Sequence, residues 1–214
     1  MTPLPFSLRR FPLRALTGAL LVSATLSACA PLIVGGAMVG GAFMVTDRRT
    51  SGAQVEDQAI ELKAMNRTRE ILGDRGHVNA TSYNRTVLLT GEVPAEADRT
   101  AVEQTVSRIE NVRSVVNELA VMGNSSLTSR SNDAILSGKV KATFVDAKDI
   151  QANAFKVYTE RGTVYLLGRV TEREANRAVD LARTISGVQK VVRVFEILTE
   201  AELADLANTN KEKK

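Results

Sequence analysis

An internal repeat constrains the fold of this chain more than any other feature of its sequence. The segment VLLTGEV recurs as VYLLGRV, with Gly91 in the first copy matching Gly168 in the second. The segment IENV recurs as ISGV 76 residues later. Each copy spans about 65 residues, over 57–121 and 132–198. A repeat of this length predicts one small domain that occurs twice in tandem.

Each copy opens with an amphipathic helix, and a second helix follows the matched glycine. In the second copy Leu136, Val140 and Phe144 recur at i, i+4 and i+8, which predicts a helix with these residues in the core. Asn132 or Asp133 is suited to cap its N-terminus. The first copy has a weaker stripe at the matching positions.

Two β-rich runs joined by a tight turn lie between the helices, and a third run follows the second helix. The runs are 78–83, 87–93 and 112–121 in the first copy and 155–159, 163–170 and 188–197 in the second. The alternation of VYLL is imperfect, which we interpret as a strand covered on one face. The order α-β-β-α-β predicts an α+β domain, with a three-stranded mixed sheet covered by two helices on one face.

The N-terminus has the order of an export signal. Arg9, Arg10 and Arg14 precede an apolar run of about a dozen residues, which is too short to span a bilayer. The sequence LSAC follows and resembles the bacterial lipobox, in which the cysteine is acylated and the chain is cut before it. Cys29 is the only cysteine of the chain, so no intramolecular disulfide competes for its thiol. The alternative is an ordinary signal peptide with a stray cysteine near the cleavage site.

The other segments complete the expected organisation. Residues 1–28 are the signal peptide, and 29–56 hold the acylated cysteine, a Gly-rich apolar tether and a polar linker. Residues 122–131 are rich in Ser, Gly and Asn and are expected to link the two copies. Residues 199–214 form a charged tail, expected to make one or two helical turns before a disordered end.

The repeat resembles the BON domain. The resemblance is carried by Gly91 and Gly168 in the middle strand, by Val112 and Val188 after the second helix, and by the segment GRVTEREA. Together with the lipobox and the tether, it makes the chain similar to the dual BON-domain lipoproteins of the outer membrane, which are associated with division and envelope stress. The resemblance implies two tandem BON domains, binding of anionic phospholipid, and support of outer-membrane integrity.

The same resemblance implies the location. In bacterial lipoproteins an aspartate after the acylated cysteine favours retention in the inner membrane, whereas here Ala30 follows Cys29. We therefore expect the protein on the periplasmic face of the outer membrane.

Charge argues against a nucleic-acid partner. Without residues 1–28, the chain has 25 basic and 24 acidic residues, so its formal charge falls from +4 to +1. The two copies differ more than the total suggests. The first has 8 basic and 10 acidic residues, a net charge of −2, and the second has 11 and 8, a net charge of +3.

No constellation for catalysis is found in the sequence. With a single cysteine and a single histidine, the chain cannot assemble a Cys/His zinc site or a Cys/His nucleophile pair. The glycines form no phosphate-binding loop. We interpret His77 as an exposed loop residue and expect no enzyme activity, no metal and no cofactor.

The resembled family places lipid binding on the first helix of the second repeat. There we predict a phospholipid-binding patch of Ile135, Lys139 and Lys141, with Ile135 inserting between headgroups and the lysines holding phosphates. A relative carries tryptophan where this chain has Ile135, so insertion is expected to be weaker or shifted. The alternative is that Ile135 packs against the linker or the first repeat and that the lysines are solvated.

Two classes of function follow. The first is an outer-membrane lipoprotein that binds anionic phospholipids such as phosphatidylglycerol or cardiolipin, with the β-barrel assembly machinery as a possible partner by family resemblance. The second is a periplasmic protein-interaction module or a chaperone-like envelope stress protein. Exposure or burial of Ile135 distinguishes them.

Overall fold

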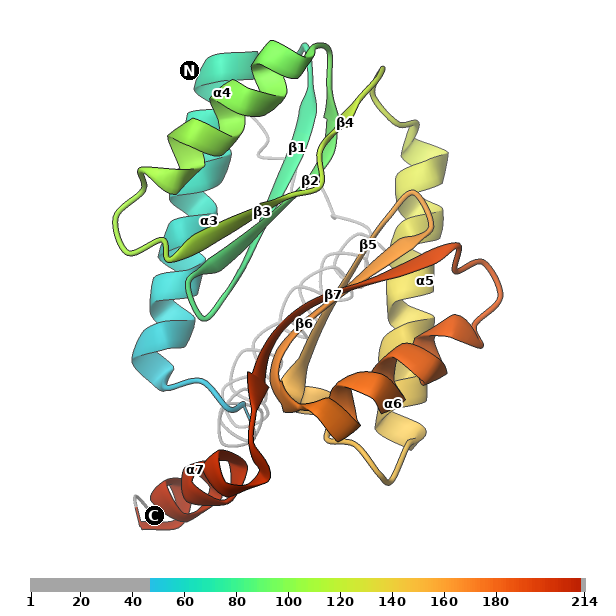
Figure 1. The fold of residues 1–214 in the computed structure, drawn as a ribbon. Coiled ribbons are helices and arrows are strands. Elements are labelled where there is room, and N and C mark those ends of the chain that lie inside the picture. The colour runs from blue at the N-terminus through green and yellow to red at the C-terminus, as the bar shows by residue number, and fades with distance from the viewer. Residues whose placement is uncertain (1–46, 213–214) are drawn as a thin grey trace, which may run out of the picture. The chain divides into compact units, whose positions relative to one another are not determined.

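The computed structural model describes residues 47–212. The expected signal peptide, Cys29 and the apolar tether lie outside the described residues. The described chain contains five α-helices and two β-sheets, one sheet in each repeat (Figure 1). This confirms the predicted α+β class.

The first repeat follows the order α-β-β-α-β. Its elements are α3 (Ser51–Leu72), β1 (His77–Tyr83), β2 (Thr86–Val93), α4 (Glu96–Ser107), β3 (Ser114–Asn117) and β4 (Ala120–Val121). Strand β2 pairs antiparallel with β1 and parallel with both β3 and β4. The last two therefore act as one interrupted third strand of a mixed sheet.

The second repeat has the same topology with an unbroken third strand. Its elements are α5 (Leu127–Asp146), a short 3₁₀ turn (Ala152–Ala154), β5 (Phe155–Glu160), β6 (Thr163–Thr171), α6 (Glu172–Arg183) and β7 (Lys190–Leu198). Strand β6 lies in the middle, antiparallel to β5 and parallel to β7. Helix α6 begins with a capping box, in which Thr171 and Glu174 satisfy each other's backbone N–H groups.

Each sheet carries its two helices on one face, where the repeat has its own core (Figure 1). The first core joins Ile60 and Ala64 of α3 to Val102 and Val106 of α4, over β2. The second core is assembled in the same way from α5, α6 and β6, and includes the edge-to-face ring pair of Phe144 and Phe155. The helical stripes predicted from periodicity are thus buried.

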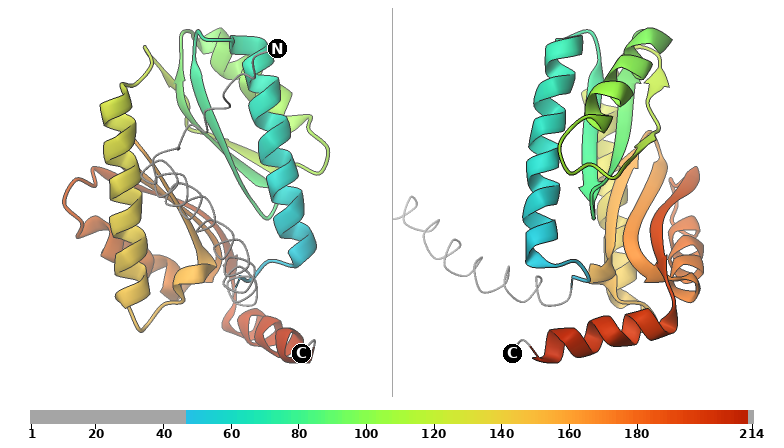
Figure 2. Two further views of the ribbon diagram at one scale, coloured as in Figure 1. Left: turned by 180° about the vertical axis from the view of Figure 1, so that it is seen from behind. Right: turned by 60° about the vertical axis from the view of Figure 1, so that its left-hand side comes forward.

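The other faces of the two sheets pack against each other, with the helix pairs outside (Figures 1 and 2). Tyr83 and Leu88 of the first repeat form one buried cluster with Tyr165 and Leu167 of the second. The prediction that the VYLL strand is covered on one face is therefore wrong. Alternate residues of β6 face α5 and α6 on one side and the first repeat on the other, and this is why its alternation is imperfect.

Helix boundaries differ from the sequence predictions. Ser126, not Asn132 or Asp133, caps α5, because its hydroxyl accepts a hydrogen bond from the N–H of Ser129 at 3.1 Å. Residues 127–131, in the segment expected to link the copies, are helical. The tail forms a 13-residue helix, α7 (Glu200–Glu212), rather than one or two turns (Figure 2).

Candidate functional site

The buried side of α5 determines which of its residues reach the surface. Leu136, Val140 and Phe144 are all buried in the second core. An α-helix turns by about 100° per residue, so residues out of phase with this stripe point away from the sheet. Because α5 lies on the outside of the second repeat, that side meets no other described helix or strand (Figure 2).

The outward side of α5 carries three large apolar residues, with the exposed Ser131 between the first two. Leu127, Ile135 and Val145 are exposed by 79%, 59% and 71%. Small exposed residues, Gly138 and Ala142, lie between them. We call these five residues the α5 apolar face. An exposed apolar stripe of this kind is typical of an interaction surface, because a large apolar side chain gains about 1.5–3 kcal/mol when it leaves water.

A lysine borders the α5 apolar face on each side. Lys139 follows Ile135 by one turn and lies about 40° from it around the helix axis, whereas Lys141 lies about 120° away in the opposite direction. Both lysines are exposed. The structure thus brings Ile135 and Lys139 together and places Lys141 on the far border of the face, beyond Val145.

Ile135 and Lys139 also line a shallow hollow of about 580 Å³ beside α5. Its other walls come from the β5–β6 turn, at Arg161 and Gly162, and from Gly187 after α6. We call this space the second-repeat hollow. Ile135 therefore lies at the rim of a hollow and is not buried against the first repeat, whereas the exposure of Lys139 and Lys141 agrees with both interpretations considered above.

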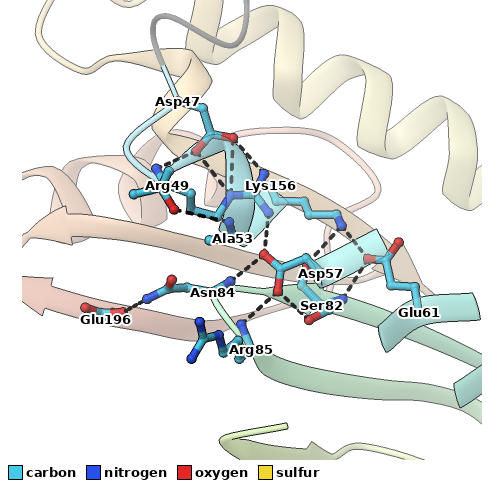
Figure 3. A network of polar contacts seen from close by, with 11 residues as sticks. Asp47, Arg49, Ala53, Asp57, Glu61, Ser82, Asn84, Arg85, Lys156 and Glu196 are labelled. Atoms are coloured by element: carbon cyan, nitrogen blue, oxygen red, sulfur yellow. Dashed lines mark hydrogen bonds and ion pairs between the residues drawn. The ribbon is translucent and has the colours of Figure 1, made fainter. Parts of the chain in front are cut away.

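The two repeats contact each other through polar groups as well as the apolar cluster. Lys156 of β5 donates to the carboxylate of Glu61 in α3 at 2.5 Å and to the backbone oxygen of Ser82 at 3.0 Å (Figure 3). Asn84, in the β1–β2 turn, donates to Glu196 of β7 at 2.6 Å. These bonds leave the α5 apolar face outside the inter-repeat contact.

A short segment before α3 bonds to both repeats. The guanidinium of Arg48 makes two hydrogen bonds of 2.7 Å to Glu174 of α6, and both side chains are buried. The guanidinium of Arg49 donates to Asp57 of α3 at 2.7 Å and stacks over the ring of Tyr83 at 4.2 Å. We call residues 47–49 the N-terminal strap.

His77 lies beside a buried carboxylate at the start of the first sheet. It begins β1, but it is partly buried rather than exposed as expected, and it lies 3.8 Å from the buried carboxylate of Glu92. Burial and the nearby Arg130 lower the pKa of His77, while Glu92 opposes that shift. Within residues 47–212, no group of three or more His, Cys, Asp or Glu side chains is arranged to hold a metal ion.

Sequence reasoning missed the two ends of the α5 apolar face. Leu127 falls in the segment 122–131 that its composition predicts to be a linker, yet Ser126 caps the helix six residues before Asn132. Val145 directly follows Phe144, the last residue of the core stripe, so helical periodicity alone does not single it out. The Ser126-Leu127 pair was the available signal, since serine is a preferred N-cap.

None of the described helices is long and apolar enough to cross a membrane.

The chain is similar in sequence to known proteins over most of its length. The profile of the BON domain family matches residues 62–123 and 132–199. Outer membrane lipoprotein DolP of Haemophilus influenzae is 40% identical over 192 residues, which cover 87% of this chain and 97% of the relative. A 21 kDa hemolysin of Actinobacillus pleuropneumoniae is 29% identical over 151 residues, covering 70% of this chain and 78% of that protein.

Solved structures give a more distant likeness. CdsD, a structural protein of the type III secretion system of Chlamydia trachomatis, aligns with 67% of this chain and 96% of its own at 13% identity. The TM-score of that alignment is 0.28.

Proposed function

This chain belongs to the BON-domain family, and we propose that it is an outer-membrane lipoprotein that binds anionic phospholipid through α5 and supports outer-membrane integrity. The sequence LSAC with Cys29 supports the lipid anchor, and similarity to the outer membrane lipoprotein of Haemophilus influenzae supports the location. One observation carries the lipid-binding part of the proposal: the α5 apolar face is exposed and has a lysine on each border.

The arrangement is suited to the interface of a bilayer. Ile135, Leu127 and Val145 can enter the boundary between headgroups and acyl chains, because an apolar helix face lies in the plane of the interface. Lys139 and Lys141 then lie at the level of the phosphates, where each is worth about 1 kcal/mol on an anionic surface. Phosphatidylglycerol and cardiolipin supply that surface charge.

The proposed anchor permits this contact. Seventeen residues, 30–46, lie between Cys29 and Asp47. A segment of that length spans at most about 60 Å when fully extended. An anchor at Cys29 therefore leaves α5 free to reach the same membrane, so that acylation and α5 binding act together.

Co-sedimentation with liposomes tests the proposal. The fragment Thr46–Lys214 forms one compact unit and contains both cores, so it is suited to measurements without the anchor. We expect it to bind vesicles that contain phosphatidylglycerol and to release them as salt is raised. The triple variant Ile135→Glu, Lys139→Glu, Lys141→Glu is expected to bind at least about 30-fold more weakly, because two lysines alone contribute about 2 kcal/mol.

A matched control separates the face from the net charge. Val55, Arg69 and Arg183 are also exposed, and Val55, at 62%, is as exposed as Ile135. Their triple change to Glu removes the same charge from other surfaces and should weaken binding far less. Equally poor binding to anionic and zwitterionic vesicles would rule out the lipid-binding role and direct the search to protein partners of the α5 apolar face.

A further inference from the structure

The first repeat also has a hollow on its surface, and only Lys63 and Glu110 among its lining residues are matched, by Lys139 and Ser186, in the second-repeat hollow. The hollow of the first repeat has a volume of about 460 Å³ and is lined by Lys63 and Arg67 of α3, by Thr105 of α4, and by the residues that follow α4, Arg108 to Glu110. We call this space the first-repeat hollow. Lys63 precedes Lys139 of the second-repeat hollow by 76 residues, the period of the repeat.

The two hollows differ in charge. The first is lined by three cations, Lys63, Arg67 and Arg108, and by one acid, Glu110. In the second, Arg161 is already 3.8 Å from the buried carboxylate of Glu92, which leaves Lys139 as the main cation. The more acidic repeat, with its net charge of −2, therefore holds the more basic hollow.

The cations of the first-repeat hollow are weakly paired. The Nζ of Lys63 is 3.9 Å from Glu110, whose side chain is 81% exposed. Arg67 is 3.8 Å from Glu70, and both of these side chains are largely exposed. Exposed pairs of this kind contribute about 0–1 kcal/mol, so a better anion can displace them.

Helix electrostatics explain only one of the three cations. Arg108 ends α4, where a positive charge is favoured by the helix dipole. Lys63 and Arg67 lie one turn apart in the body of α3. The helix dipole does not favour a positive charge there, because its effect is confined to the ends of a helix. The helix dipole therefore does not explain why Lys63 and Arg67 line the same hollow as Arg108.

We propose that the first-repeat hollow binds the phosphate group of a phosphate ester. Two guanidinium groups can donate paired hydrogen bonds to phosphate oxygens, and Lys63 adds a third positive charge. The hydroxyl of Thr105, on the same wall, is a further donor. The ligand is either a soluble phosphate ester or a phospholipid headgroup, and this site is separate from the α5 apolar face.

Titration of the Thr46–Lys214 fragment with glycerol 3-phosphate, followed by amide NMR, tests the site. We expect saturable shifts at Thr105, Arg108 and Ile109. The triple variant Lys63→Gln, Arg67→Gln, Arg108→Gln should weaken binding at least about tenfold, because each charged hydrogen bond contributes more than a neutral one. Glu110→Gln removes the only acid of the hollow and should strengthen binding.

The control variant Arg69→Gln, Arg85→Gln, Arg113→Gln removes the same charge from exposed positions outside the hollow. A parallel titration with phosphatidylglycerol nanodiscs, using protein that carries the Ile135, Lys139 and Lys141 changes, distinguishes the two sources. Shifts with glycerol 3-phosphate indicate a soluble ester, and shifts with nanodiscs alone indicate a headgroup. The proposal is overturned if neither ligand shifts these amides, or if the control triple loses as much binding as the hollow triple.

Discussion

Two aspartates one repeat apart perform the same task at the residue level. Asp133 of α5 accepts hydrogen bonds from the backbone N–H groups of Arg161 and Gly162 at 2.7 and 2.8 Å. Asp57 of α3 accepts from Asn84 and Arg85 at 2.7 Å (Figure 3). Each aspartate ties the first helix to the β-hairpin turn of its own repeat. All four turn residues have positive φ, as a tight two-residue hairpin requires.

Asp133→Asn should therefore destabilise the second repeat. The amide keeps one acceptor oxygen and turns an N–H₂ group toward a backbone N–H, so one charge-assisted bond becomes a repulsive contact. We expect the free energy of unfolding to fall by about 2–3 kcal/mol, measured by urea denaturation of the Thr46–Lys214 fragment. Asp180→Asn, on the exposed side of α6, makes the same chemical change and should alter stability by less than about 0.5 kcal/mol. Equal effects of the two variants would contradict this role of Asp133.

At the level of the element, the matched glycines let two strands approach closely. A Cβ on Gly168 of β6 would lie 2.4 Å from the backbone oxygen of Ala154, and one on Gly91 of β2 would lie 2.0 Å from that of His77. Gly91 also has a φ of +114°, which few other residues adopt. In both repeats the close backbone oxygen belongs to the residue just before the glycine's partner in the first strand, Val78 or Phe155.

Gly168→Ala and Gly138→Ala should consequently have opposite effects. The first forces a side chain against backbone, and we expect a loss of about 1–3 kcal/mol. The second adds a methyl group to the exposed side of α5, with no atom within 4 Å, and should stabilise the helix by about 1 kcal/mol. Thermal unfolding of both variants checks the prediction. A Gly168→Ala protein as stable as the original would show that the strands can move apart at little cost.

The sequence predicted the elements better than their ends or their assembly. Periodicity identified Leu136, Val140 and Phe144 because a helix that is buried on one side has apolar residues about every four positions. The start of α5 was missed because Asp133 has the residue type of a cap but binds the hairpin turn, and only the fold brings that turn within reach. The contact between the sheets was missed because Tyr165 and Leu167 do not differ in type from the core residues Val164 and Leu166. Predicting the α5 apolar face would have required knowing both where α5 begins and which side of it points away from the sheet.

At the level of the whole molecule, the N-terminal strap connects the expected anchor to both repeats. Arg48 bonds to Glu174 and to the backbone oxygen of Arg169 in the second repeat. Arg49 bonds to Asp57 and covers Tyr83 in the first. Tyr83 belongs to the apolar cluster between the sheets. The residues that follow the expected tether therefore stabilise the docking of the two domains.

Glu174→Gln should weaken the strap in a pH-dependent way. Burial alone would raise the pKa of Glu174, but the hydrogen bonds from Arg48 and from the Thr171 backbone outweigh it, so its pKa lies below the usual value. Such a carboxylate stabilises the fold above its unfolded pKa, and the contribution is lost as the pH falls through the folded pKa. Near neutral pH we expect the variant to lose about 3 kcal/mol, because Arg48 stays buried without a charged partner.

The melting temperature of the Thr46–Lys214 fragment, followed from about pH 7 to about pH 3, measures this effect. The difference between the original protein and Glu174→Gln should shrink as Glu174 becomes protonated. Glu172→Gln provides the control, since its pair with Arg193 is exposed at 3.3 Å and contributes about 0–1 kcal/mol. A difference that stays constant with pH would mean that Glu174 acts through packing rather than charge. A difference that shrinks would show that an ion pair next to the expected tether helps to hold the two domains together.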